Sequence, residues 1–138
     1  MSDSTSRLDA STPPYALLGG RAEVEALASA FYDAMERDEP ELTRLHRLNA
    51  NGGVAAEVRE RFASFLVGWL GGPDDYVAAH GHPRLRMRHA RVPVDERMRD
   101  AWLRCMQTAL DARGVQGDLR GFLERRFAEV ADFMRNQP

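Results

Sequence analysis

The sequence predicts an all-α protein built from four long amphipathic helices. In each predicted helix the apolar residues recur at steps of three and four, which places them on one face. No segment shows the period of two that is typical of a half-buried strand. A length of 138 residues suits a single domain with one core.

The first long helix is expected from residue 21 until just before Pro40, and the pair Gly19-Gly20 precedes it. Proline does not continue a helix interior but is favoured at a first helical position. Pro40 therefore ends this helix and opens a short one through about Leu45, before a loop at 49–53. The inward stripe of the first helix comprises Val24, Leu27, Ala28, Phe31 and Met35.

Three further long helices are expected. The second ends at Gly71-Gly72-Pro73, because glycine followed by proline stops a helix. The third runs from about Val94 to Arg113, and the fourth follows Gly117. Their inward stripes comprise Val54, Val58, Phe62, Phe65, Leu66 and Trp69; Met98, Trp102, Cys105, Met106, Ala109 and Leu110; and Leu119, Phe122, Leu123, Phe127, Val130, Phe133 and Met134. Residues 74–92 lack this periodicity, so we expect only short helical turns there.

Composition excludes several classes of protein. With 19 basic and 21 acidic residues, the net charge is −2, which provides no basic face for nucleic acid or for an anionic membrane. No apolar run approaches the ~20 residues of a membrane span. The single cysteine, Cys105, cannot form an intramolecular disulfide, which fits the cytoplasm. Residues 1–14 are polar and lack the apolar stretch of a secretory signal, so we expect a flexible tail before one domain at 15–138.

Three histidines lie close together in the sequence: His80, His82 and His89. A zinc site is one interpretation, but no cysteine is near and no helical i, i+4 pair fixes the ligands. A surface position suits His80. His89 differs because Met87 and the segment 92–94 surround it with apolar residues. An imidazole offered from a loop to an apolar space between helices suits a haem iron, since one ring nitrogen binds the metal and the other donates a hydrogen bond.

Aromatic residues gather on the inward faces of three predicted helices. A flat hydrophobic cofactor explains them, and ordinary core packing is the alternative. The residues alone therefore leave open a haem protein and a non-haem helical module that packs against itself or a partner. The aromatic set is Phe31, Tyr32, Phe62, Phe65, Trp69 and Trp102.

Four motifs in order resemble the group II truncated haemoglobins. They are Phe31-Tyr32; Phe-Leu-x-x-Trp-Leu-Gly-Gly-Pro-x-x-Tyr at 65–76; Gly-His-Pro-Arg-Leu-Arg-Met-Arg-His-Ala at 81–90; and Asp-Ala-Trp-Leu-x-Cys-Met at 100–106. The glycine pairs at 19–20 and 71–72 also resemble the two glycine motifs of that family. The resemblance covers about residues 15–136. It implies a globin-like two-over-two helical sandwich, with a shortened first helix and an extended loop before the proximal histidine.

The resemblance implies haem b as the cofactor, with His89 as the iron ligand. It also implies that the Tyr32 hydroxyl and the Trp102 indole N–H face the gas ligand. His46 at the distal edge is a third candidate contact, and Val58 would occupy a gate to the pocket. The residues expected to contact haem are Tyr32, His46, Arg61, Phe62, Phe65, Tyr76, Met87, Arg88, His89, Trp102 and Met106.

Three of these residues are candidates to bind the haem propionates. Guanidinium and phenol groups suit carboxylate oxygens, which favours Arg61, Tyr76 and Arg88 for this role. A solvated surface charge is the alternative for the two arginines. One departure from the family lies at 90–94, which reads Ala-Arg-Val-Pro-Val where many relatives carry Pro-Phe. A bulky aromatic residue beside the haem is therefore missing.

The implied function is reversible binding of oxygen and of other diatomic gases, carbon monoxide and nitric oxide, with an unidentified reductase keeping the iron ferrous. Such a protein is expected as a monomer or a homodimer. Each hydrogen bond to the gas ligand is worth about 1 kcal/mol. Two such bonds would slow oxygen release on the order of 10–100-fold. Slow release favours redox chemistry, such as weak peroxidase or nitric oxide dioxygenase-like activity, over simple oxygen transport.

Overall fold

The computed structural model describes residues 12–81 and 94–135, and within these ranges every regular element is a helix. The all-α fold class is therefore confirmed. An antiparallel bridge between Leu48 and Val54 closes the loop before the fourth helix. In chain order the helices are α1 (Pro14–Leu18), α2 (Arg21–Asp38), α3 (Pro40–Arg44), α4 (Ala56–Trp69), α5 (Asp75–His80), α7 (Glu96–Ala112) and α8 (Gly117–Met134).

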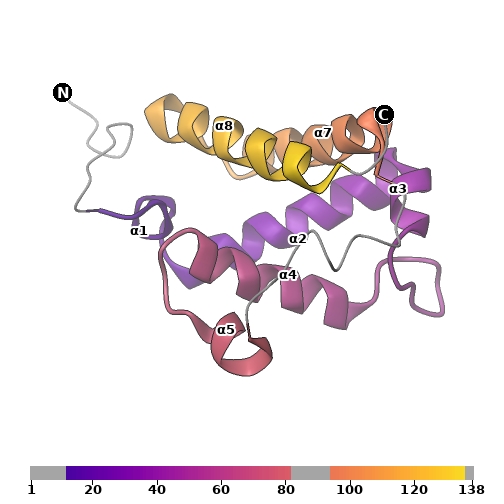
Figure 1. Cartoon of the computed structure of the whole chain (residues 1–138), viewed down its shortest axis with the longest axis horizontal. Coiled ribbons are helices and arrows are strands. Elements are labelled where there is room, and N and C mark those ends of the chain that lie inside the picture. The colour runs from indigo at the N-terminus through magenta and orange to yellow at the C-terminus, as the bar shows by residue number, and fades with distance from the viewer. Residues whose placement is uncertain (1–11, 82–93, 136–138) are drawn as a thin grey trace.

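The helices form two layers of two (Figure 1). Helices α2 and α4 pack together in one layer, while α7 and α8 lie side by side in the other. Helix α2 is central, because it contacts both α4 and α7. The short helices are peripheral: α1 and α3 contact α2, and α5 contacts α4. Within the described ranges, no helix combines the length and the apolar character that crossing a membrane requires.

The core lies around α2. Each side chain of its predicted stripe is at most 1% exposed, and Phe31 is the largest of them. Burying a side chain of this size contributes about 1.5–3 kcal/mol. A buried hydroxyl fixes the adjoining α3, since Thr43 Oγ1 donates to the carbonyl oxygen of Met35 at 2.9 Å. On α7, burial raises the pKa of the Cys105 thiol to about 12, as expected for a core cysteine.

Three details differ from what periodicity indicates. Val54, expected at the start of the stripe of the second long helix, lies in the bridge to Leu48, before α4 begins at Ala56. Periodicity does not indicate helix α1, because five residues are too few to show one, although the resemblance implies a shortened first helix. Pro14 at its first position supplies a start signal. Phe133 was expected to face inward, and this is wrong: it is 57% exposed. The buried stripe of α8 continues through Ala131 and Met134, so Phe133 falls off that face.

The glycines after α4 allow the N-terminal segment to pack against it. The Tyr15 N–H donates to the carbonyl oxygen of Leu70 at 2.9 Å. A Cβ at Gly72 would lie 2.5 Å from Tyr15 Cδ1, and one at Gly71 would lie 2.6 Å from Pro13 Cβ. Gly71 also has φ +98°, in the left-handed region that side chains disfavour. These two positions therefore need glycine for close approach.

We expect Gly71→Ala to destabilise the fold more than Gly52→Ala. Both glycines have positive φ, but nothing lies within 4 Å of a Cβ at Gly52. The backbone strain alone should lower the free energy of unfolding by about 1–2 kcal/mol at Gly52. Gly71→Ala should lower it further, because the Pro13 ring must also move. Urea denaturation measures both, and equal losses would contradict the packing described here.

Candidate functional site

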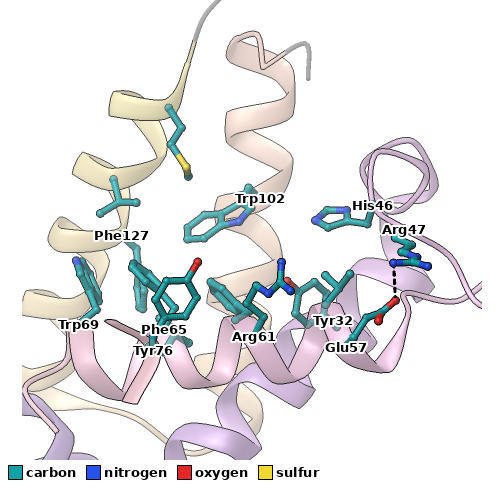
Figure 2. Close-up of a pocket in the computed structure, with 15 residues that line it drawn as sticks. Tyr32, His46, Arg47, Glu57, Arg61, Phe65, Trp69, Tyr76, Trp102 and Phe127 are labelled. Atoms are coloured by element: carbon teal, nitrogen blue, oxygen red, sulfur yellow. Dashed lines mark ion pairs between the residues drawn. The ribbon is translucent and has the colours of Figure 1, made fainter. Parts of the chain in front are cut away.

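A cavity of about 370 Å³ lies between α4 and the pair α7 and α8 (Figure 2). Side chains from five helices and from the loop after α3 converge on it. The lining residues are Tyr32, His46, Arg47, Glu57, Val58, Arg61, Phe62, Phe65, Leu66, Trp69, Tyr76, Trp102, Phe127, Val130 and Met134.

Aromatic rings build one wall of the cavity. On α4 the ring of Phe65 is stacked with those of Phe62 and Trp69, with centroids 6.4 Å apart in each pair. Trp69 in turn stacks on Phe127 of α8, at 5.2 Å and 27°. Steps of three and four along α4 produce this row, since such residues share a helix face. The wall is apolar, and its aromatic rings suit an apolar, aromatic ligand.

Tyr32 of α2 provides a hydroxyl at the cavity. The residue is only 4% exposed, and no hydrogen bond joins this hydroxyl to another described residue. Burial raises the pKa of Tyr32, and the positive charge of Arg59 lowers it by less. The hydroxyl therefore stays protonated and can donate across the physiological pH range.

His46 lies near Tyr32, and its ring is held by the backbone of Leu42. Its Nδ1 is 2.9 Å from the carbonyl oxygen of Leu42. A carbonyl oxygen only accepts, so Nδ1 carries the proton of the neutral ring. The two rings lie 5.8 Å apart and nearly perpendicular. The hydrogen bond thus orients the imidazole of His46 at the cavity beside Tyr32.

Charged groups line the same cavity. Arg47 and Glu57 form an ion pair of 3.0 Å between the loop after α3 and the first turn of α4 (Figure 2). Both side chains are more than half exposed, so this pair contributes little stability. Arg61 of α4 is exposed, and Tyr76 of α5 is buried with its ring 5.9 Å from Phe65. The lining thus combines apolar walls with cationic, anionic and phenolic groups.

The structure brings together seven of the eleven residues predicted to contact a cofactor. They are Tyr32, His46, Arg61, Phe62, Phe65, Tyr76 and Trp102. Met106 does not line this cavity; it is 1% exposed in the core. Met87, Arg88 and His89 lie outside the described residues, as do His82 and the side chain of His80.

Some lining residues were not selected from the sequence. Phe127, Val130 and Met134 of α8 belong to an apolar stripe that carries no polar group to mark a site. The pair Arg47 and Glu57 joins two segments ten residues apart, and no motif marked it.

Residues 14–136 match the model of the bacterial-like globins. The chain belongs to that family. It is 43% identical over 81 residues to a group 2 truncated haemoglobin of Bacillus subtilis, covering 59% of this chain and 61% of that protein. It is also 35% identical over 110 residues to one of Lotus japonicus, covering 79% and 64%. The matched part is thus less than two thirds of either relative.

Solved structures extend this comparison to the fold. A cold-adapted truncated haemoglobin of Pseudoalteromonas haloplanktis is 42% identical, with a TM-score of 0.84 and coverage of 92% of this chain and 100% of that one. A group II truncated haemoglobin of Bacillus anthracis is 33% identical, with a TM-score of 0.83 and coverage of 92% and 98%. The resemblance to group II and the two-over-two globin fold are confirmed.

Globins bind haem, and the lining of this truncated globin fits that cofactor. The aromatic row suits the porphyrin faces, while Arg61 and Tyr76 suit its propionates. The cavity volume also lies within the range of ~300–1,000 Å³ usual for ligand pockets. Hydrogen-bond donors stand at the cavity on α2 and α7, in Tyr32 and Trp102. The described residues therefore provide the walls, the polar edge and the donors that a haem site needs.

We expect Tyr32 to ionise only far above the ordinary tyrosine range. Burial disfavours the charged phenolate, so the pKa is raised. The chain has three tyrosines, and NMR of ¹³C-labelled tyrosine can follow the Cζ resonance of each. The resonance that Tyr32→Phe removes should stay constant up to pH 10.5, provided that circular dichroism shows an intact fold. A midpoint near the ordinary value of ~10 would contradict its burial.

Proposed function

We propose that this truncated globin binds haem b and reversibly binds oxygen, with carbon monoxide and nitric oxide as further ligands. When bound, haem supplies an iron atom that takes a diatomic gas. The observation that carries the proposal is the presence of two donors, Tyr32 and Trp102, at one aromatic cavity. They come from different helices, so each can donate without displacing the other.

The two donors are held by shared packing. The ring of Phe31 lies 5.0 Å from that of Tyr32 and 5.2 Å from that of Trp102. Phe62 is in contact with both, at 5.6 Å and 6.4 Å. Because two rings support both donors, the hydroxyl and the indole N–H have little freedom to move apart. Such preorganised donors strengthen a polar interaction in a dry pocket.

Strong donation supports slow oxygen release, and slow release favours redox chemistry on oxygen or nitrogen species over oxygen transport. A solved relative supports this proposal: the oxygen-avid truncated haemoglobin of Bacillus subtilis, which is 34% identical, has a TM-score of 0.81 and coverage of 91% and 100%.

We further propose a cytoplasmic location and a reductase partner that keeps the iron ferrous. His46, oriented beside Tyr32, is proposed as a third polar contact.

For the iron ligand we propose His89. The support is its place at the end of the motif at 81–90, together with membership of the globin family. One nitrogen of a neutral imidazole binds the iron while the other N–H donates to a neighbour. Met87 and Arg88, adjacent in the same motif, are proposed to contact the haem and a propionate.

Tyr32→Phe should accelerate oxygen release several-fold or more, and Trp102→Phe should do the same. Carbon monoxide release should change less, because bound carbon monoxide carries less negative charge on its outer atom. The double variant should be non-additive, since both donors share one ligand. Flash photolysis and stopped-flow mixing measure these rates. Equal effects on the two gases would assign both rings to packing alone.

His89→Ala should abolish stable haem retention or leave a weakly held haem with an altered spectrum. The reason is loss of the one protein bond to iron that we propose. The Soret band of purified protein measures it, with His82→Ala and His46→Ala as matched histidine controls. A wild-type Soret band in His89→Ala, with loss in a control, would move the iron ligand elsewhere.

Substitution of Arg61, Tyr76 or Arg88 should speed haem transfer to an acceptor protein while leaving the spectra of gas complexes nearly unchanged. Propionate anchors hold the edge of the cofactor and do not contact the iron. Arg61→Met, Tyr76→Phe and Arg88→Met remove the polar groups with little change in side-chain length. If haem loss is unaltered in all three, these residues are ordinary surface or packing residues.

A further inference from the structure

A cation, Arg59, lies next to the ring of Tyr32. The guanidinium carbon of Arg59, on α4, lies over the ring at 5.5 Å from its centroid. This is within the ~6 Å range of an attractive cation–π contact. Arg59 does not line the cavity, so it contacts Tyr32 without facing the gas-binding space.

Two carboxylates of α2 fix the guanidinium in this position. Arg59 is 3.1 Å from an oxygen of Asp33 and 2.8 Å from an oxygen of Glu36. The side chains of Arg59 and Glu36 are 23% and 31% exposed, so this pair is more shielded from solvent than the pair with Asp33, which is 63% exposed. The same oxygen of Glu36 accepts the backbone N–H of Val54 at 2.6 Å. The network therefore joins α2, α4 and the segment that leads into α4.

Other contacts restrict the remaining sides of the Tyr32 ring. Phe31, Phe62 and His46 lie 5.0–5.8 Å from it, with interplanar angles from 73° to 84°. Three rings and one guanidinium thus surround the phenol. A change in Arg59 is transmitted to the direction of the hydroxyl, because the packed ring has few alternative positions.

The charge of Arg59 also acts on the phenol oxygen. A nearby cation favours the charged form of a phenol, so it makes the O–H a better donor. The positive charge of Arg59 lowers the pKa of Tyr32, against the larger rise caused by burial. The position of Arg59 and its charge therefore both favour hydrogen-bond donation by the Tyr32 hydroxyl.

We propose that Arg59 is a positioning residue for the distal hydrogen bond, which sets both the orientation and the donor strength of the Tyr32 hydroxyl. The inference rests on the proposed function, in which Tyr32 donates to the gas ligand. It extends that function to a residue that itself touches neither gas nor haem.

The test compares Arg59→Met with Arg120→Met in the haem-loaded protein. Arg120 is a matched control on α8: it is 20% exposed and pairs with Asp111 at 2.8 Å and Glu124 at 3.1 Å. Arg59→Met should accelerate oxygen release about two- to fivefold, the range that a cation–π contact of ~0.5–1 kcal/mol implies. Arg120→Met should leave the rate unchanged. Equal rates in the two variants would overturn the proposal.

Two spectroscopic readouts separate positioning from general loosening. The stretching frequency of bound carbon monoxide should shift in Arg59→Met toward the value of Tyr32→Phe, and not in Arg120→Met. The ¹³Cζ resonance of Tyr32 in the carbon monoxide complex should also move. In a Tyr32→Phe background, Arg59→Met should have no further effect, since its influence acts through the hydroxyl. An additive effect would overturn the proposal.

A milder pair of substitutions, Arg59→Lys and Arg120→Lys, provides the test if Arg59→Met does not fold. Lysine retains the charge but lacks the planar guanidinium that pairs with both carboxylates, so Arg59→Lys should give a smaller shift in the same direction as Arg59→Met. Arg120→Lys is its control, and an unshifted Arg59→Lys would overturn the proposal. Tyr32→Phe with equal effects on both gases would overturn the proposed donor role of Tyr32 and this inference together. If Tyr32→Phe accelerates oxygen release more than carbon monoxide release but Arg59→Met changes neither rate, only the inference is overturned.

Discussion

The packing of Phe31 between three other aromatic residues is the contact on which the arrangement depends. This ring, 1% exposed on α2, lies 5.0–5.2 Å from the rings of Tyr32, Phe62 and Trp102. It therefore joins α2 to α4 in its own layer and to α7 in the other. Because the two donors flank one buried ring, the fold core and the distal side of the cavity are a single packed unit. A change in that core is also a change in the site.

The apolar character of α4 shows how the cavity relates to stability. On this helix only Leu66 and Val67 are fully buried, while Phe62, Phe65 and Trp69 are partly exposed. Apolar surface left in water costs about 25 cal/mol per Å². A flat ligand that covers this row removes that cost, so binding and folding are linked. In a chain of 138 residues, a haem in this position would be part of the core as much as a cofactor.

The sequence predicted the long helices well, since each carries a strong stripe and a glycine or proline signal at its ends. Periodicity did not predict α1, where five residues show no period, although the resemblance implied a shortened first helix. Periodicity also missed the outward direction of Phe133. Periodicity alone left open whether the aromatic residues form a core or a site. The resemblance favoured a site, and seven of the eleven residues that it selected line one cavity. The α8 side of the cavity and the contact of Arg59 with Tyr32 depend on tertiary packing, which no local sequence pattern encodes.

Polar groups around Tyr32 follow an order that explains why the hydroxyl remains a donor. The charged groups next to Tyr32 do not line the cavity. The guanidinium of Arg59 lies over the Tyr32 ring, and Asp33 and Glu36 pair with that guanidinium. Among the residues that line the cavity, the neighbours of Tyr32 are the apolar ring of Phe62 and the imidazole of His46, whose Nδ1 is hydrogen-bonded to Leu42. A carboxylate within reach of the Tyr32 hydroxyl would accept its hydrogen bond, but Glu57, the carboxylate that lines the cavity, pairs with Arg47 at 3.0 Å. With Asp33 and Glu36 paired to Arg59, the ring of Tyr32 contacts a cation, and Tyr32 itself lines the cavity. That arrangement leaves the proton available to a ligand within the cavity.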